Sequence, residues 1–259
     1  MNSIKNISYG EHPAQRLDIH LPDCESFPVF IYFHGGGLEA GDKAGEHETN
    51  AYRCLTSRGI AAVGVNYRLY PGAEYPQFID DAARAAAFVV NNIGSCGNAG
   101  GIYLGGSSAG AYLSMMLCFD SSRLARYGLS PLRFSGFLHD AGQPTCHFNV
   151  LKERGVDPRR VVADDTAPIF HVGADERYAP MLIMVSDNDM ENRYEQNILL
   201  LSTLRHFGHK EPKVRLKIMH GTHCEYLFKT DQNGESLFGG IVCDFIKDTE
   251  RLQKNKENG

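Results

Sequence analysis

The 259-residue sequence predicts an α/β fold, a three-layer α/β/α sandwich built on a mostly parallel sheet. Three observations lead to this expectation. Apolar, β-rich runs alternate along the chain with segments of helical periodicity, which is typical of repeated βαβ units. Most of these runs are apolar throughout, as in strands that helices cover on both faces. The chain is also long enough to bury a large core within one domain.

The elements follow one another in a regular order. The early stretch QRLDIHLP alternates apolar and polar residues, which favours an antiparallel edge strand at the start of the sheet. Six further strands are expected at residues 28–33, 60–67, 101–105, 134–140, 181–186 and 214–219. Helices are expected at residues 46–58, 76–93, 108–119, 191–207 and 235–252. These elements predict a single domain over residues 1–259.

Residues 120–178 fit the alternation least well. They contain one strand and then PTCHFNVLKERGVDPRRVVADDTAPIFHVG, which is rich in charge and proline. Substrates of open α/β sheets bind beyond the carboxyl ends of the strands. We therefore interpret this segment as an insertion on the substrate side, with a surface loop of no particular role as the alternative.

Composition and charge exclude several classes of partner. The net charge of −5 gives no reason to expect nucleic acid or an anionic membrane. No apolar run approaches the roughly 18–20 residues that span a bilayer. The N-terminal stretch MNSIKNISYGEHPAQRL lacks the apolar core of a secretion signal, so a cytoplasmic location is expected. Seven cysteines without a CxxC pair argue against a disulfide framework and a cysteine-rich zinc site.

The stretch GIYLGGSSAGAYLSMML carries the first chemical signal. Its residues 106–110 fit G-x-S-x-G, with a predicted strand before them and a predicted helix after them. In such a nucleophile elbow a strained turn raises the central serine out of the sheet, and the two glycines leave room for neighbouring backbone. This frame predicts Ser108 as the nucleophile and Ser107 as a spacer.

A serine hydroxyl is a weak nucleophile and needs a base, which in turn needs an acid to orient it. The stretch PMLIMVSDNDMEN offers Asp187 and Asp189 just after one predicted strand. The stretch IMHGTHCEY offers His220 and His223 just after the last one. The chain order serine, acid, histidine is the one that this architecture uses.

A fourth component follows the strand at residues 28–33. The stretch FIYFHGGGLEAGD places His34 and three glycines directly after that strand. Glycines let backbone N–H groups turn toward the oxyanion of a tetrahedral intermediate, and the N–H of Ala109, next to the nucleophile, completes the set. The pattern predicts an oxyanion hole.

Three blocks together, YFHGGG, VNYRLYPGAEYP and GGSSAGAYL, resemble the α/β-hydrolase superfamily. Within it the sequence is similar to the esterases with an HGGG loop that are related to hormone-sensitive lipase. The resemblance implies hydrolysis of a carboxylic ester through an acyl-serine intermediate. It also implies Asp189 as the acid, His223 as the base, and Gly36 and Gly37 as oxyanion donors beside Ala109. Ser186 stands where the family's Gly-x-x-Asp pattern has glycine, which selects Asp189, and Asp187 is the alternative acid.

Only 33 residues precede the glycine loop, too few for the helical cap of many lipase-like relatives. The sequence is more similar to the compact subgroup that contains kynurenine formamidases and acetyl or feruloyl esterases acting on plant carbohydrate. We expect a small-molecule ester of a short or medium acyl group as substrate, with no metal or organic cofactor. An arylformamidase or a peptidase is the alternative. A binding protein that keeps the fold without activity is the non-enzyme alternative.

Four other motifs are incomplete in this sequence. The glycines after the strand at residues 28–33 loosely fit a dinucleotide-binding fingerprint. That fingerprint needs an acid at the end of the next strand, where Asn66 and Tyr67 stand. A phosphate-binding loop would need a lysine after GIYLGGS. The stretch DNDMEN has Asn192 where a calcium loop needs glycine. His220 and His223 lack a third zinc ligand at suitable spacing.

Overall fold

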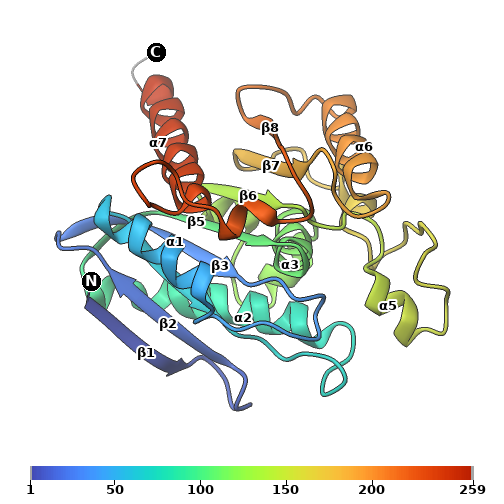
Figure 1. The fold of residues 1–259 in the computed structure, drawn as a ribbon, viewed down its shortest axis with the longest axis horizontal. Coiled ribbons are helices and arrows are strands. Elements are labelled where there is room, and N and C mark those ends of the chain that lie inside the picture. The colour runs from blue at the N-terminus through green and yellow to red at the C-terminus, as the bar shows by residue number, and fades with distance from the viewer. Residues whose placement is uncertain (1, 258–259) are drawn as a thin grey trace.

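The computed structural model describes residues 2–257 and places an eight-stranded sheet between two layers of helices (Figure 1). The predicted domain also includes Met1, Asn258 and Gly259, which lie outside the described residues. The strands are β1 (Asn2–Ser8), β2 (Arg16–Leu21), β3 (Ser26–Phe33), β4 (Ala61–Val65), β5 (Asn98–Ser107), β6 (Gly136–Asp140), β7 (Met181–Ser186) and β8 (Val214–Met219). The helices are α1 (Glu46–Ser57), α2 (Gln77–Asn92), α3 (Ala109–Phe119), α4 (Ser121–Ala125), α5 (Phe148–Glu153), α6 (Arg193–His206) and α7 (Leu237–Glu257).

The strand order is β1-β2-β4-β3-β5-β6-β7-β8. Strands β1 and β2 are antiparallel to their neighbours, and the strands from β4 to β8 run parallel to one another. The predicted α/β class with a mostly parallel sheet is therefore confirmed. Because parallel strands end at one edge of a sheet, the loops after β3, β5, β7 and β8 share that edge.

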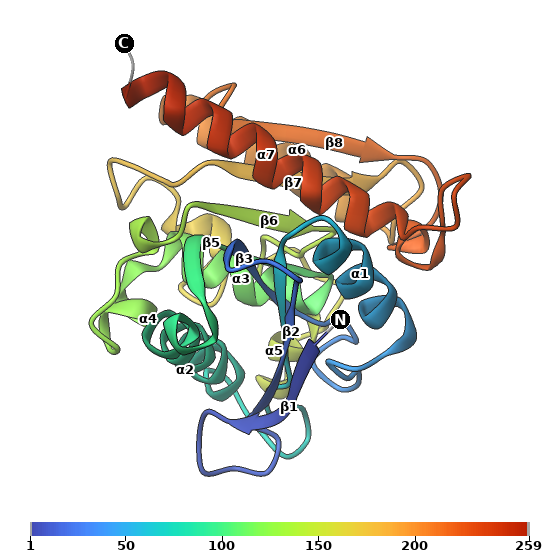
Figure 2. The ribbon, with the colours of Figure 1, turned by 90° about the vertical axis from the view of Figure 1, so that its left-hand side faces the viewer.

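Helices cover both faces of the sheet. Figures 1 and 2 show α1 and α7 on one face and α2 and α3 on the other. An aromatic-rich core lies under α1 and α7, with Tyr52 and Phe238 among its buried residues. The opposite core includes four fully buried alanines of α2, a helix that packs against α3. None of the helices within residues 2–257 is both long enough and apolar enough to cross a membrane.

The start of the sheet differs from the expectation. The QRLDIHLP strand is not the edge, because β2 lies between β1 and β4. Strand β1 has no clear apolar alternation: Ile4 is 43% exposed, and the register shifts between Ile4 and Ile7, where Asn6 has a positive φ of 57°. Such a bulged, half-exposed strand leaves little periodic signal.

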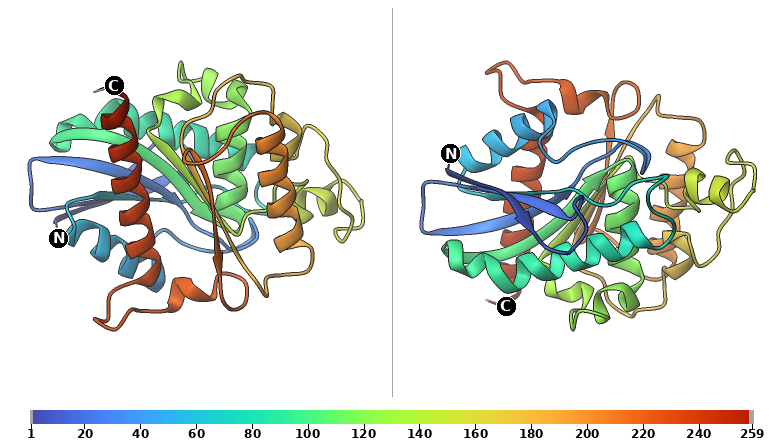
Figure 3. Two further views of the ribbon diagram at one scale, coloured as in Figure 1. Left: turned by 90° about the horizontal axis from the view of Figure 1, so that it is seen from above. Right: turned by 90° about the horizontal axis from the view of Figure 1, so that it is seen from below.

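Residues 120–178 contribute both to the sheet and to its surroundings. They supply β6, which lies between β5 and β7, and then α5 with a long loop. Figure 3 shows this loop projecting from the end of the molecule opposite to β1. One contact ties the segment to the glycine loop: the side-chain amide of Asn149 donates to the carbonyl oxygen of Gly37 at 2.6 Å. The interpretation as a substrate-side insertion stays a prediction.

Candidate active site

Ser108 stands at the turn between β5 and α3. Its φ of 53° and ψ of −112° lie outside the regions that non-glycine residues favour, so the backbone is strained at this residue. The amide N–H of Ser108 donates to the carbonyl oxygen of Asp140 at 2.7 Å, which ties the turn to the neighbouring strand β6. Ser108 remains partly exposed, so its hydroxyl can be reached by a substrate.

The two glycines that flank the turn are required by close backbone contacts. A Cβ atom on Gly106 would lie 2.4 Å from the carbonyl oxygen of Gly110. A Cβ atom on Gly110 would lie 2.0 Å from the carbonyl oxygen of Phe33, at the end of β3. Only hydrogen atoms fit here, which explains the glycines in the G-x-S-x-G pattern.

The Gly110→Ala substitution is expected to destabilise the protein by about 3 kcal/mol or more, because the new methyl group would push β3 away from the elbow. Chemical denaturation of the purified protein measures this loss. Gly94→Ala is the control, since no atom lies within 4 Å of the added Cβ, and a change below about 1 kcal/mol is expected. Equal stability of the two variants would contradict the steric argument.

The structure brings Ser108, His223 and Asp189 together. The Nε2 atom of His223 lies 2.8 Å from the Ser108 Oγ atom. The Nδ1 atom of the same ring lies 2.5 Å from Oδ1 of Asp189. The pairing of β7 with β8 explains the second contact, because Ser186 and Met219 are register partners and the acid and the histidine follow them within four residues.

Asp189 is a buried carboxylate with three donors. Besides His223, the amides of Met190 and Ser186 donate to it, at 2.8 and 3.2 Å. Burial by itself raises the pKa of the Asp189 carboxyl, but its hydrogen bond to His223, the charge of that ring and the two amides outweigh this effect. The pKa of Asp189 therefore lies below its usual value, and the group is a stable anion beside the imidazole.

Asp187 belongs to a second, solvent-facing pair. It accepts hydrogen bonds from His220 Nδ1 at 2.5 Å and from the amide of Gly221 at 3.1 Å. The His220 side chain is 95% exposed, and no contact links it to Ser108. The structure thus keeps Asp187 and His220 apart from the elbow serine.

The glycine loop lies beside the elbow, because Phe33 of β3 and Gly106 of β5 are register partners. Gly36 and Gly37 have φ values of 108° and 65°, and their amides donate no hydrogen bond within residues 2–257. The amide of Ala109 is free of an intrahelical acceptor because Ala109 is the first residue of α3. Three unused donors therefore lie near the serine.

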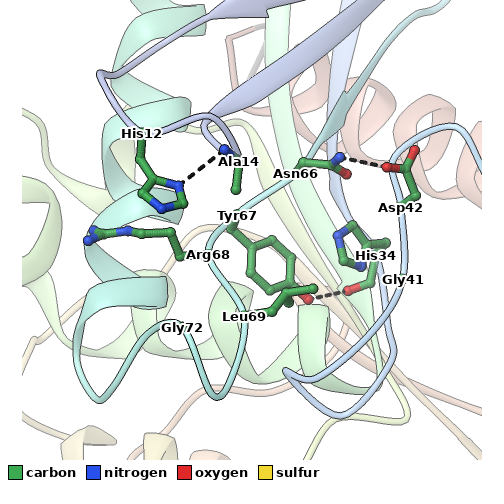
Figure 4. Close-up of a pocket in the computed structure, with 10 residues that line it drawn as sticks. All are labelled: His12, Ala14, His34, Gly41, Asp42, Asn66, Tyr67, Arg68, Leu69 and Gly72. Atoms are coloured by element: carbon green, nitrogen blue, oxygen red, sulfur yellow. Dashed lines mark hydrogen bonds between the residues drawn. The ribbon is translucent and has the colours of Figure 1, made fainter.

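A polar brace holds the back of the glycine loop (Figure 4). The hydroxyl of Tyr67 donates to the carbonyl oxygen of His34 at 2.7 Å, and the two rings stack with centroids 4.5 Å apart. The side-chain amide of Asn66 donates to Asp42 at 2.7 Å. Burial lowers the pKa of His34, which favours the neutral form of its ring. These residues line a separate cavity of about 290 Å³ behind the loop.

A buried network under the elbow was not predicted from the sequence. The Oγ atom of Ser107 donates to Asp140 Oδ2 at 2.5 Å and accepts from the Tyr32 hydroxyl at 2.9 Å. The Tyr226 hydroxyl donates to the other oxygen of Asp140. Burial raises the pKa of Asp140 to about 6, although both hydroxyls favour the ionised form. The only sequence signal was a carboxylate that ends the apolar strand FSGFLHD.

A cavity of about 450 Å³ opens at Ser108 and His223. Its walls are mainly apolar and come from the loops after β3, β7 and β8 and from α5. The lining residues are Gly35, Gly36, Gly37, Gly41, His47, Glu48, Ser107, Ser108, Phe148, Met190, His223, Cys224, Leu227 and Phe228. Within residues 2–257, no cluster of three or more histidine, cysteine or acidic side chains is placed to hold a metal ion.

A mostly parallel sheet with a serine elbow, a histidine and an acid at its carboxyl edge defines the α/β-hydrolase class. The chain has the α/β-hydrolase fold, which confirms the predicted fold class. Residues 17–129 match the family model described as BD-FAE, and this range includes the glycine loop and the elbow.

Two curated relatives match about half of the chain. An isoprenylcysteine alpha-carbonyl methylesterase of Arabidopsis thaliana is 34% identical over 42% of this chain and 26% of its own length. The kynurenine formamidase of Danio rerio is 31% identical over 52% of this chain and 45% of its own length. The chain thus matches between a quarter and a half of these relatives.

Several solved structures cover nearly the whole chain. The truncated form of a carbohydrate esterase from gut microbiota superposes with a TM-score of 0.78 and 19% identity, over 96% of this chain and 97% of that one. At this identity the likeness concerns the fold.

Proposed function

We propose that this protein is a serine hydrolase that cleaves carboxylic esters of short or medium acyl groups through an acyl-serine intermediate. One observation carries the proposal: the imidazole of His223 is within hydrogen-bond distance of both Ser108 Oγ and Asp189 Oδ1. A serine, a base and an orienting acid in this chain of contacts form the machinery of nucleophilic acyl transfer.

Each group has a defined task in the proposed reaction. Ser108 Oγ attacks the ester carbonyl while His223 Nε2 takes its proton. His223 then gives the proton to the leaving alcohol, and a water molecule repeats the sequence to release the acid. Asp189 holds Nδ1 protonated and stabilises the imidazolium. The amides of Gly36, Gly37 and Ala109 bind the oxyanion.

The cavity and the relatives support a small or medium ester as substrate. A volume of about 450 Å³ with mainly apolar walls accommodates such an acyl group. The relatives are named as a methylesterase and a kynurenine formamidase, and the structural neighbour as a carbohydrate esterase. An acetyl or feruloyl ester of plant carbohydrate is one candidate. Hydrolysis of an N-formylarylamine is the second candidate, because the same groups attack a formamide carbonyl.

A substrate panel tests the proposal. The purified chain is incubated with 4-nitrophenyl acetate, butyrate and octanoate, methyl ferulate, acetylated xylan and N-formylkynurenine, and initial rates are compared. Turnover is expected for the acetate and butyrate esters, with a decline at octanoate. Faster release from N-formylkynurenine than from every ester would establish the formamidase alternative. Absence of turnover on all six compounds would support the inactive binding protein.

A further inference from the structure

A second cavity, of about 520 Å³, adjoins the catalytic one. Phe148 and Met190 line both cavities, so these two apolar side chains lie between the second cavity and the one at Ser108. Its polar lining includes Gln143, Arg159, Arg160, Glu191, Arg193 and Gln196. Residues 143–160 come from the segment around α5, and residues 190–196 from the start of α6.

Arg193 is a buried cation in this lining. The residue is only 4% exposed, and its guanidinium donates to the carbonyl oxygen of Ala141 at 2.6 Å and to Gln143 Oε1 at 3.4 Å. No ion pair within residues 2–257 includes it. Burial lowers the pKa of Arg193, and the charge of Asp189 offsets this only in part. Only neutral acceptors contact this buried cation. An anionic ligand beside it would therefore stabilise the charge.

The rim of the cavity adds further positive charge. Arg159 is held by Asp157, at 2.6 Å between Nη2 and Oδ2. The side chain of Arg160, by contrast, makes no hydrogen bond or ion pair within residues 2–257. Glu191 is the one acidic residue in the described lining. Because Asp157 pairs with Arg159, the lining keeps two further arginines, Arg160 and Arg193, against Glu191, in a chain whose net charge is −5.

We propose that this second cavity binds a carboxylate at the far end of the ester substrate, with Arg160 and Arg193 as its partners. The inference rests on the proposed esterase function. Guanidinium groups suit a carboxylate because their planar donors match its two oxygens. Phe148 and Met190 would cover an apolar spacer between the carboxylate and the ester. The substrate class is therefore a half-ester of a dicarboxylic acid or an acyl ester of a hydroxy acid.

Matched pairs of esters test this class on the full-length chain. The first series compares 4-nitrophenyl half-esters of dicarboxylic acids with the same compounds capped as methyl esters. The second series compares acetoxybenzoates with their methyl esters. In at least one series the anionic compound is expected to have a kcat/KM about tenfold or more above that of its neutral partner, mainly through KM. Added sodium chloride should reduce this preference.

Two substitutions assign the preference to the cavity. Arg160→Ala removes an exposed cation, and Arg193→Lys keeps the buried charge but loses the planar fork. Each is expected to reduce the anionic-to-neutral ratio of kcat/KM at least fivefold. Arg205→Ala is the control. This exposed arginine lies on α6, as Arg193 does, but it lines neither cavity. The ratio of the control should equal that of the wild type.

The outcomes separate the two proposals. Equal hydrolysis of anionic and neutral esters by the wild type would overturn the carboxylate site and leave the esterase function standing. An anionic preference that survives in both arginine variants would also overturn it, as would preference for a phosphate-bearing ester over its carboxylate counterpart. Failure of every ester, together with no labelling of Ser108 by a fluorophosphonate, would refute the esterase function itself.

Discussion

Substitution of Ser108 by alanine is expected to lower kcat for a neutral ester by about 10⁴- to 10⁶-fold. The hydroxyl is the proposed nucleophile, and without it the histidine has no proton to take. The fold is expected to remain, because alanine keeps the Cβ atom and the substitution removes only the hydrogen bond to His223. Single-turnover assays measure the loss of the chemical step, and circular dichroism checks the fold.

The adjacent serine provides a matched control for this experiment. Ser107 has the same side chain, but its hydroxyl is buried between Tyr32 and Asp140. Ser107→Ala is expected to reduce stability by about 1–3 kcal/mol, because it leaves buried polar groups without a partner. Its kcat should fall by less than about tenfold. A larger loss of kcat in Ser107→Ala than in Ser108→Ala would refute the assignment of the nucleophile.

Strands β7 and β8 begin and end at the predicted residues. Strand β7 is buried along its whole length and is apolar almost throughout. Strand β8 is a partly exposed edge strand, and its sequence VRLKIM alternates apolar and basic residues. Strand β1 was missed because its apolar residues are few and partly exposed. Helices α4 and α5 have only five and six residues, too few to show a period of 3.6.

The sequence predicted the parts of the candidate site in which a short motif requires a particular backbone conformation. In G-x-S-x-G and HGGG the glycines mark positions without a side chain. The structure shows which atoms a Cβ atom at each of these positions would contact. Asp140, Arg160 and Arg193 carry no such pattern. Their places depend on the register of β6 with β5, on the path of the loop after α5 and on the position of α6 after β7, which are long-range properties of the fold.

The second large effect on kcat is expected from replacing the acid that orients His223. Asp189→Asn is expected to lower kcat by about 10⁴-fold, since an amide that donates to His223 Nδ1 would place the ring proton on Nε2. Nε2 could then no longer accept the proton of Ser108. The substitution keeps the size of the side chain, and its oxygen, at the position of Oδ2, can still accept from the amide of Ser186. The measurement is kcat for 4-nitrophenyl acetate, with thermal unfolding as the check on the fold.

Asp187→Asn tests the same change of charge and shape two residues away. Asp187 contacts an exposed histidine that has no link to the elbow, and a surface pair of this kind contributes little. Its kcat is expected to fall by less than about threefold. Similar, mild losses in the two variants would show that neither acid orients the base. A large loss in Asp187→Asn alone would move the acid to position 187 and require the loop after β7 to rearrange before catalysis.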